Sequence, residues 1–439
     1  MQRIGIIGCG YVGLVTAACL ADAGSSVLCA DSDKRKIAKL KSEGVPFYEP
    51  GLDELVLKNH KAKRLRFTSS TTEVVKGSDI IFICVGTPSR SDGSADLTAV
   101  EKVATDIAHA MDAYKIIVEK STVPAETGAR IRKTIEMAGR GKTEFDVVSN
   151  PEFLREGQAI HDTMHPDRIV LGVESKRAEK TLRALYAPLR APVIVCNIAT
   201  AEIIKHACNS FLATKISFIN AIARICELVD ADVLKVAEAM GLDKRIGPAF
   251  LNAGAGYGGS CFPKDVDAFI HLADQKGYDF ELAKAVRKIN TDQRTLLLKK
   301  IEEVLWNVKG KTVAVLGLSF KPDTDDLRNS VALDVVRALQ DLGALVRAYD
   351  PKAMPKAKTE LKSVRFAKDA YDAAKGSHCL LLMTEWAEFR DLDLARIHKL
   401  MQQPVIVDAR NFFDPETVKV QGFTYRGIGR GASAPQPRR

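Results

Sequence analysis

The sequence predicts an α/β protein in which two doubly wound domains are joined by a central helical domain with a long helix. Three observations predict this architecture. Short apolar runs alternate with helical patterns over 1–199, long helical patterns replace them over 200–305, and the strand and helix alternation returns over 306–430. A chain of 439 residues is also too long for one ordinary core.

The first domain, 1–199, is expected to contain a parallel sheet. Its strand candidates are continuous apolar runs, which indicate strands that are covered on both faces. Such strands are typical of sheets built from β-α-β units. The runs lie at 3–8, 26–31, 79–86, 115–121, 146–151, 168–173 and 192–197.

The second domain, 200–305, opens with a long helical pattern. Residues 200–231 keep apolar side chains at three- and four-residue spacing and contain no Pro or Gly. A helix of roughly 30 residues is about 45 Å long, which is more than one sheet domain needs. We therefore expect this helix to span between domains or to carry the interface of a homodimer.

The third domain, 306–430, repeats the plan of the first. A strand, a Gly turn, a helix and a second strand that ends in Asp occur in the same order in both. Its strands are expected at 311–320, 344–351, 378–385 and 404–411, with a helix at 329–342. The tail, 431–439, is low in apolar residues and is expected to be disordered.

Composition excludes several classes of function. The chain is 46% hydrophobic but has no apolar run of the about 18 residues that a membrane span needs, and Met1 leads into a strand-like run instead of a signal peptide, so the cytoplasm is expected. The net charge of +9 is spread along the chain without a nucleic-acid-binding motif, and it suits an anionic small substrate. The nine cysteines are not spaced as metal ligands are, so we expect reduced thiols and no bound metal.

A glycine motif predicts dinucleotide binding near the N-terminus. Gly8, Gly10 and Gly13 form G-x-G-x-x-G directly after a strand, which allows a tight turn, close approach of a pyrophosphate, and close packing of the next helix. Asp31 ends the second strand, where a carboxylate binds the ribose hydroxyls of NAD and repels a 2′-phosphate. The basic residues 34–36 leave NADP open as an alternative.

The stretch "GYGGSCFPKD" places a thiol before an expected helix. Pro263 suits the first turn of a helix, so Cys261 would precede a helix N-terminus, which stabilises a thiolate. Asp265 can return to the same face and act on a proton or a water molecule. Gly258 and Gly259 leave room for a ligand to approach the backbone. The alternative is a buried cysteine in a tight turn.

Two further motifs place polar side chains at expected ligand positions. Lys205 and Asn209 lie on one face of the long helix, where an ammonium and an amide suit a developing oxyanion, although a lone lysine on a helix is usually solvated. Glu152 and Glu156, in "SNPEFLREG", follow a strand and either clamp a ligand or begin a helix. With "KSTVP" after the preceding strand, they gather at strand carboxyl ends, where ligands bind in such sheets.

Together these motifs resemble the UDP-glucose/GDP-mannose dehydrogenase family over nearly the whole chain. The stretches that carry the resemblance are "IGIIGCGYVGL", "VGTPS", "STVP", "NPEFLREG", "EIIKHACNSF", "RIGPAFLNAGAGYGGSCFPKD", "GLSFKPDTDDLRNS" and "VDARN". The resemblance implies an NAD-binding Rossmann domain, a helical dimerisation domain and a Rossmann-like UDP-sugar domain. It also implies four-electron oxidation of UDP-glucose to UDP-glucuronate with two NAD, in which Cys261 forms a thiohemiacetal and then a thioester.

The resemblance further implies roles for single residues. Lys205 and Asn209 would stabilise oxyanions, Asp265 would orient water with Thr122, and Glu152 would assist thioester hydrolysis. The implied NAD contacts are Gly8, Gly10, Tyr11, Val12, Gly13, Asp31, Lys36, Val85, Thr87, Ser121, Thr122, Glu156, Lys264 and Arg328. The implied UDP-sugar contacts are Glu152, Phe153, Leu154, Arg155, Glu156, Lys205, Asn209, Arg245, Phe250, Leu251, Asn252, Gly254, Gly258, Phe320, Lys321 and Arg410, with Arg245 reaching a neighbouring subunit. Gly86 departs from the family pattern, in which Asn is common.

Three alternatives remain at this point. A two-electron β-hydroxyacid dehydrogenase shares the sheet and the long helix with its Lys and Asn, but it needs neither Cys261 nor a third domain. A non-catalytic NAD-sensing protein would not need the Lys, Asn, Cys and Asp together. Within the family, "GYGGSCFPKD" favours UDP-glucose over GDP-mannose and UDP-N-acetylhexosamines.

Overall fold

The computed structural model describes residues 2–42, 44–139, 141 and 143–430. The predicted disordered tail, 431–439, lies outside these residues. The described chain falls into two compact units. The first unit contains the residues up to 208 together with 267–278, and the second contains 209–266 together with the residues from 279 onward.

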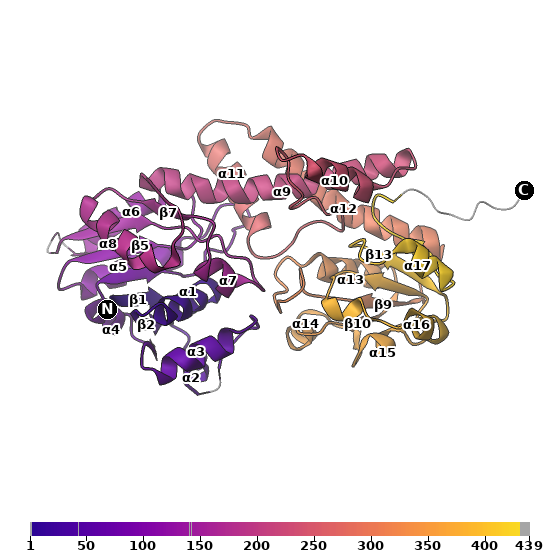
Figure 1. Ribbon diagram of the computed structural model, residues 1–439, viewed down its shortest axis with the longest axis horizontal. Coiled ribbons are helices and arrows are strands. Elements are labelled where there is room, and N and C mark those ends of the chain that lie inside the picture. The colour runs from indigo at the N-terminus through magenta and orange to yellow at the C-terminus, as the bar shows by residue number, and fades with distance from the viewer. Residues whose placement is uncertain (1, 43, 140, 142, 431–439) are drawn as a thin grey trace, which may run out of the picture. The chain divides into compact units, whose positions relative to one another are not determined.

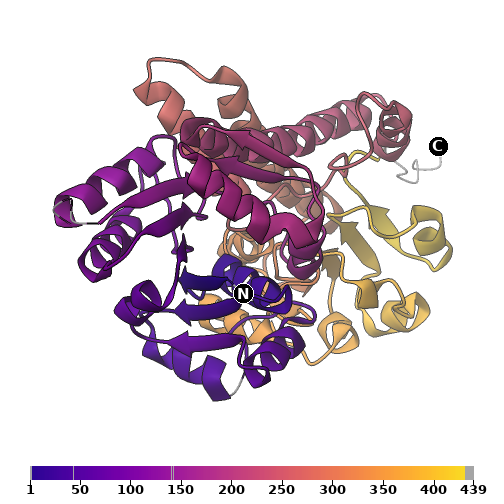
Figure 2. The same cartoon turned by 60° about the vertical axis from the view of Figure 1, so that its left-hand side comes forward.

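The first unit is built on an eight-stranded sheet with helices on both faces, as Figure 2 shows for the indigo to magenta part of the chain. In sheet order the strands are β3 (Leu65–Thr68), β2 (Ser26–Ala30), β1 (Arg3–Ile7), β4 (Ile80–Ile83), β5 (Lys115–Glu119), β6 (Phe145–Ser149), β7 (Ile169–Gly172) and β8 (Val193–Cys196). Neighbouring strands are parallel, except that β7 pairs antiparallel with β6.

Two apolar cores cover the two faces of this sheet. The helices that lie wholly within the unit are α1 (Tyr11–Asp22), α2 (Lys34–Ser42), α3 (Leu52–Lys61), α4 (Thr71–Gly77), α5 (Thr98–Ala110), α6 (Thr127–Gly139), α7 (Ala159–Met164), α8 (Lys176–Tyr186) and the short 3-10 helix η1 (Ala187–Leu189). One core lies under α1, α2, α3, α7 and α8, and the other lies under α4, α5 and α6. Burial on both faces explains the continuous apolar strands of the sequence.

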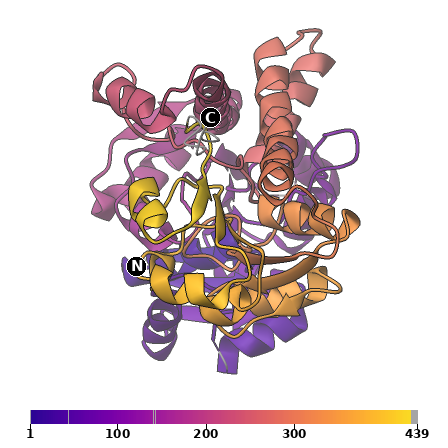
Figure 3. The same cartoon turned by 90° about the vertical axis from the view of Figure 1, so that its right-hand side faces the viewer.

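The second unit contains a six-stranded parallel sheet, also with helices on both faces (Figure 3, orange to yellow). In sheet order the strands are β11 (Arg365–Phe366), β10 (Leu345–Tyr349), β9 (Thr312–Leu316), β12 (Cys379–Leu382), β13 (Val405–Asp408) and β14 (Thr424–Arg426). The helices that follow these strands are α13 (Val331–Asp341), α14 (Met354–Glu360), α15 (Ala370–Ala374), η2 (Ala387–Phe389), α16 (Leu394–Leu400) and α17 (Pro415–Val420).

The two sheets share one strand order. Numbered from its own first strand, each contains the order 3-2-1-4-5-6, first in β3-β2-β1-β4-β5-β6 and again in β11-β10-β9-β12-β13-β14. This is the doubly wound Rossmann order, which reverses between its first and fourth strands and binds ligands at that point. The predicted fold class, with its two Rossmann-like domains, is confirmed.

The part of the sequence that separates the strands of the two sheets is helical. Residues 200–305 contain α10 (Val233–Leu242), α11 (Phe262–Gln275), α12 (Glu281–Leu305) and most of α9 (Ile198–Leu228), an unbroken helix of 31 residues (Figure 1). The helix ends three residues before the predicted end at 231, because Asp230 adopts a left-handed φ of +57° and Ala231 N bonds to Cys226 O. Among the described residues, no helix is long and apolar enough to cross a membrane.

Two features of the sheets differ from the prediction. The strands β7 and β8 run against β1–β6, whereas a wholly parallel sheet was expected. All four residues of β7 are buried. Its apolar run therefore indicates a buried strand, but it does not indicate whether the strand runs parallel or antiparallel to its neighbours. The sequence also did not predict β3, β11 and β14, which are short strands of four, two and three residues with charged members.

Candidate active site

The turn between β1 and α1 forms the candidate cofactor cradle. Gly8 has a φ of +106°, which favours glycine, and a Cβ at Gly13 would lie 1.9 Å from the Gly8 carbonyl oxygen. A Cβ at Gly10 would meet no atom of the described chain within 4 Å. Gly10 precedes the first turn of α1, which begins with Tyr11 and Val12 and has no side-chain cap among the described residues. This open helix start, with its free N–H groups, fits the pyrophosphate of NAD.

Asp31 follows β2 and binds the same turn. Its Oδ2 accepts hydrogen bonds from Cys9 N at 2.9 Å and from Lys36 Nζ at 2.8 Å, and its Oδ1 accepts one from Asp33 N at 2.9 Å. Burial raises the pKa of Asp31, but the bonds from Lys36, Asp33 and Cys9 outweigh it and lower the pKa overall. The carboxylate is thus ionised, as ribose binding requires, and Lys36 is already paired with it.

Polar groups join the loops that follow β4 and β5. Ser121 Oγ donates to Val85 O at 2.8 Å, and Thr87 Oγ1 donates to Thr122 O at 2.8 Å. Both loops stand at strand carboxyl ends: β4 neighbours β1 at the point where the strand order reverses, and β5 is the next strand of the sheet. A Cβ at Gly86 would meet no described atom within 4 Å, so the departure from the family's Asn leaves open space in this loop.

Glu49 anchors the loop after β6 to α1. It is 4% exposed and accepts hydrogen bonds from Gly157 N at 2.6 Å and from Ala159 N at 2.7 Å. The Tyr11 hydroxyl also contacts the Glu49 carboxylate, and Gly157 N donates to the same hydroxyl at 3.0 Å. The pKa of Tyr11 is raised, mainly by burial and secondly by the hydrogen bond to the Glu49 carboxylate. The loop that contains Glu156, which is itself buried, is therefore fixed at its end.

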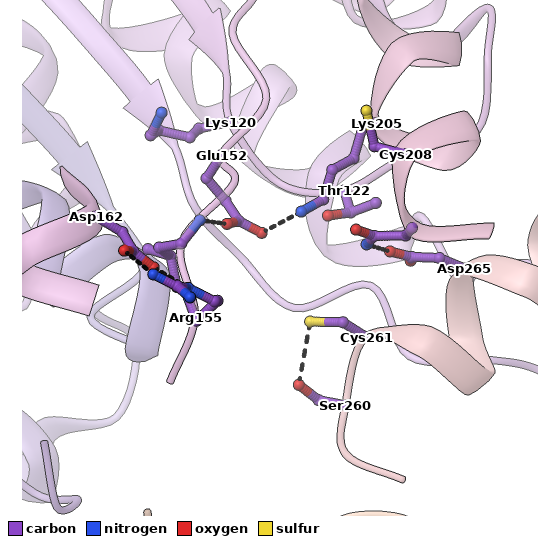
Figure 4. A network of polar contacts seen from close by, with 12 residues as sticks. Lys120, Thr122, Glu152, Arg155, Asp162, Lys205, Cys208, Ser260, Cys261 and Asp265 are labelled. Carbon is purple, nitrogen blue, oxygen red and sulfur yellow. Dashed lines mark hydrogen bonds and ion pairs between the residues drawn. The ribbon is translucent and has the colours of Figure 1, made fainter. Parts of the chain in front are cut away.

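Glu152 and Lys205 form a buried ion pair (Figure 4). Lys205 Nζ on α9 lies 2.9 Å from Glu152 Oε1, and the two side chains are 5% and 6% exposed. The other carboxylate oxygen of Glu152 accepts a hydrogen bond from Leu154 N at 2.8 Å. The Lys205 ammonium also lies 5.4 Å from the centre of the Phe153 ring. The structure thus brings together four of the residues predicted to bind substrate.

Two neighbouring arginines hold the outer part of this loop. The Arg168 guanidinium stacks 3.6 Å from the centre of the Phe153 ring and donates to Cys208 Sγ at 3.7 Å. Arg155, predicted to bind substrate, donates through Nε and Nη2 to the Asp162 carboxylate at 2.9 and 2.7 Å (Figure 4). Its guanidinium therefore stiffens the loop in this structure.

In the second unit, Cys261 stands directly before α11, as predicted. The residue is partly exposed, and its thiol lies 3.5 Å from Ser260 Oγ (Figure 4). Asp265 N donates to the Cys261 carbonyl at 2.8 Å, which closes the first turn of the helix. The Asp265 side chain is fully buried, and its carboxylate accepts hydrogen bonds from Asn209 Nδ2 at 2.5 Å and from Lys264 Nζ at 2.7 Å.

Arg410 joins three loops of the second unit. From the end of β13, its Nε donates to Met383 O at 2.8 Å and its Nη2 donates to Phe320 O at 3.2 Å. Its Nη1 reaches Gly256 O at 3.5 Å. Its guanidinium therefore lies at the carboxyl ends of β9, β12 and β13, where an anionic ligand of this sheet is expected to bind.

The segment 250–258 packs closely on the same unit. Gly254 N donates to Asn220 Oδ1 at 2.8 Å, and a Cβ at Gly258 would lie 2.3 Å from Asn329 O. Phe250 takes a left-handed φ of +65°. Leu251 is buried, whereas Asn252 is exposed.

Three predicted ligand residues make local contacts in this structure. Arg245 pairs with Asp243, and Arg328 pairs with Asp326, each at 2.6 Å and with its side chain largely exposed. The Lys321 ammonium lies 5.7 Å from the centre of the neighbouring Phe320 ring. These contacts are local, and the predicted ligand-binding roles of the three residues stay predictions.

The second Rossmann-like sheet has a buried aspartate at the position that Asp31 holds in the first. Asp350 follows β10 just as Asp31 follows β2, but it is 1% exposed. Its Oδ2 accepts hydrogen bonds from Leu318 N, Ser319 N and Trp386 Nε1, and its Oδ1 accepts two from backbone N–H groups. Because the Asp350 carboxylate is buried and hydrogen-bonded within the protein, it is not accessible to a ribose in this structure.

Several residues of the site were missed in the sequence. Glu49, Lys120, Asn150, Arg168 and Tyr186 are bonded to the predicted residues or to their neighbours. Lys120 and Asn150 each follow a strand directly and stand one or two residues before a predicted site residue, and this position could have identified them. The other three come from distant parts of the chain, and no spacing relates them to the site.

The candidate catalytic residues divide between the two units. Thr122, Glu152 and Lys205 belong to the first unit, and Asn209, Cys261 and Asp265 belong to the second. Lys205 and Asn209 are one turn apart on α9. In the part of the chain that the structure describes, no cluster of His, Cys, Asp and Glu side chains can hold a metal ion.

Models of one protein family match this chain in three successive segments. They are the NAD binding domain of the UDP-glucose/GDP-mannose dehydrogenase family over 2–190, its central domain over 199–292 and its UDP binding domain over 314–415. The UDP-glucose 6-dehydrogenase TuaD of Bacillus subtilis is 49% identical over 433 residues, which are 98% of this chain and 94% of TuaD. The UDP-glucose 6-dehydrogenase of Rhizobium meliloti is 45% identical over 98% of this chain and 100% of its own.

A solved structure agrees with these matches. The UDP-glucose dehydrogenase of the hyperthermophilic archaeon Pyrobaculum islandicum superposes with a TM-score of 0.92 at 37% identity, over 98% of both chains. The glycine cradle, the acidic end of β2, the thiol before α11 and these similarities lead to one conclusion. This chain belongs to the UDP-glucose/GDP-mannose dehydrogenase family.

Proposed function

We propose that this protein oxidises the primary alcohol of UDP-glucose to the carboxylate of UDP-glucuronate, through a thioester on Cys261. The observation that carries the proposal is the place of this thiol, partly exposed and directly before α11, one turn from the buried Asp265. A two-electron β-hydroxyacid dehydrogenase needs no such thiol. Identity of 45–49% to UDP-glucose 6-dehydrogenases supports UDP-glucose as the sugar nucleotide.

In the first oxidation, Lys205 and Asn209 stabilise the substrate oxygen as it loses its proton. The Lys205 ammonium is buried beside Glu152, and a fixed positive charge in a dry site acts strongly on a developing oxyanion. NAD, when bound, accepts a hydride in each of the two oxidations. The residues that suit it are the cradle at Gly8, Gly10 and Gly13.

Cys261 then holds the aldehyde for the second oxidation. Its sulfur forms a bond to the carbonyl carbon and the oxygen takes a proton, which gives a thiohemiacetal that still carries a hydrogen on carbon. Loss of that hydrogen as hydride, together with the proton of the thiohemiacetal hydroxyl, leaves the thioester. Water adds to the thioester carbon, the C–S bond breaks, and the thiol recovers its proton. Glu152 and Asp265 are the carboxylates that assist and orient this water, together with Thr122.

These roles assign one task to each part of the chain. Residues 1–199 bind NAD, residues 200–305 form the dimer and carry the central catalytic groups, and residues 306–430 bind the UDP-sugar. Arg410 is the favoured cation for the anionic nucleotide, because its guanidinium already joins three loops at strand carboxyl ends. The reduced thiols expected from the cysteine spacing suit a cytoplasmic enzyme.

The homodimer is proposed to form along α9. Phe211, Phe218 and Ile225 follow one another at intervals of seven residues on this helix, and each is about half exposed or more. Leu228 extends the same apolar surface at 85% exposure. A row of apolar side chains at this period is typical of a helix that packs against another helix.

We expect two NADH for each UDP-glucose consumed, because both oxidations take place at one carbon. The measurement follows NADH by absorbance and UDP-glucuronate by chromatography under limiting sugar nucleotide. The rate of NADH formation with UDP-glucose is compared with the rates with GDP-mannose and with UDP-N-acetylhexosamines at equal concentration, and UDP-glucose should be the fastest substrate. One NADH for each sugar, with free aldehyde accumulating, would exclude the four-electron reaction.

Replacing the thiol is expected to abolish the second oxidation. Cys261→Ala has no nucleophile, so UDP-glucuronate formation should fall by a factor of about a thousand or more while UDP-glucose binding survives. Cys261→Ser should retain binding and accumulate a sugar ester that intact mass detects. Cys196→Ser, at another partly exposed cysteine, is the matched control and should keep activity. Near-normal turnover by Cys261→Ala would refute the covalent mechanism.

Asp31 is expected to set the preference for NAD over NADP. Loss of charge-assisted hydrogen bonds in Asp31→Ala should raise the KM for NAD about tenfold or more. The variant should also lower the KM for NADP, because Lys36 would become free to bind the 2′-phosphate. Steady-state kinetics with both cofactors measure this. Asp79→Ala, which removes an exposed aspartate of the same unit, should leave the ratio unchanged; a wild type that prefers NADP would contradict the assignment.

A charge in the α9 row is expected to separate the dimer. Phe218→Asp would bury a carboxylate in the proposed interface, and the cost of desolvating it should shift the protein to monomers. Light scattering after gel filtration gives the molar mass. Trp306→Asp, at a 95% exposed side chain outside α9, is the control and should stay dimeric. A monomeric wild type, or a dimeric Phe218→Asp, would rule out this interface.

A further inference from the structure

A buried lysine lies behind the Glu152–Lys205 ion pair, and the mechanism above does not use it. Lys120 follows β5 and is 8% exposed. Its ammonium donates to Asn150 Oδ1 at 3.1 Å and to Asn150 O at 3.3 Å, and Asn150 supplies the only acceptors that the described residues offer it. An ammonium is costly to bury, so a position like this one needs a physical reason.

Asn150, the partner of Lys120, makes three further hydrogen bonds. Its Nδ2 donates to Val170 O at 2.8 Å, its N donates to Glu119 O at 2.9 Å, and its Oδ1 also accepts from Tyr186 OH at 2.5 Å. Asn150 therefore ties the end of β6 to β5, β7 and α8. Every polar group of this side chain is bonded, so its position is fixed.

The fixed asparagine stands two residues before Glu152. The intervening residue, Pro151, is buried and restricts its own φ, so the backbone between Asn150 and Glu152 has little freedom. Burial lowers the pKa of Lys120 overall, and neighbouring groups that include the Glu152 carboxylate offset this only in part.

We infer that Lys120, acting through Asn150, is a positioning residue for the Glu152 carboxylate in thioester hydrolysis. This inference rests on the proposed function, in which Glu152 assists the water that attacks the thioester. Lys120 contacts neither substrate nor cofactor in this role. It holds the segment 150–152 in place through its bonds to Asn150.

The chain offers a matched control at the other end of the same strand. Lys115 begins β5, is 3% exposed, and donates to one backbone carbonyl, Ser78 O, at 2.7 Å. Lys115→Met and Lys120→Met thus each remove one buried ammonium, at the start of β5 and directly after its end, and only the second change touches Asn150. A purely structural role for Lys120 predicts the same loss for both variants.

The test combines rapid mixing of the full-length enzyme with NAD and UDP-glucose, NADH absorbance, and intact mass after acid quenching. Lys120→Met is expected to lose about tenfold or more in steady-state turnover, with KM values within about twofold. Because hydrolysis is the slowed step, a burst approaching two NADH per site should precede the slow phase, and most chains should carry a glucuronyl adduct on Cys261. Lys115→Met should show wild-type turnover per folded enzyme and no added adduct.

Tyr186→Phe keeps the ring and removes one hydrogen bond to Asn150. It should show the same burst and adduct with a smaller loss, about threefold, and it decides the question if Lys120→Met does not fold. Turnover of Lys120→Met equal to that of Lys115→Met, or a loss without burst and adduct, would overturn the positioning role. A wild type that yields one NADH per sugar would instead remove the proposed function itself, so the two failures are distinguishable.

Discussion

The buried ion pair between Glu152 and Lys205 is the interaction on which the candidate site of the first unit depends. Removing two charges from water costs roughly several kcal/mol per ion, which only close contact and further hydrogen bonds offset. The structure supplies both, with a 2.9 Å contact, a bond from Leu154 N and the ring of Phe153 beside the ammonium. The long helix α9 and the loop after β6 are therefore held in one arrangement, since separating them would leave two buried charges unpaired.

The same constraint applies one turn further along α9. The Asp265 carboxylate is fully buried, and Asn209 and Lys264 donate to it. Lys205 and Asn209 lie on one helix face, so a single face supplies a donor to each buried carboxylate. Polar groups that are buried and fully bonded keep their positions without reorganising. Fixed donors of this kind are what the stabilisation of an oxyanion requires.

Much of the fold could be predicted because burial leaves a direct trace in sequence. Strands covered on both faces are continuously apolar, and the glycine at position 13 is required wherever α1 packs against the turn at Gly8. Burial does not depend on strand direction, so the reversal of β7 and β8 left no trace. The short strands β3, β11 and β14 contain charged residues and resemble loops until neighbouring strands pair with them.

By itself, the sequence determined the fold class, the glycine cradle with Asp31, and a thiol directly before a helix, since each depends on residues close together in the chain. Tertiary structure alone decided which groups meet. Glu152 faces Lys205 across 53 residues, and Asp265 faces Asn209 across 56. It also decided that the Asp31 side chain stays 11% exposed, whereas Asp350, at the same place in the second sheet, is buried and bonded by its own chain. Local spacing cannot encode such pairings, because they arise only when distant strands and helices pack and bury their polar groups together.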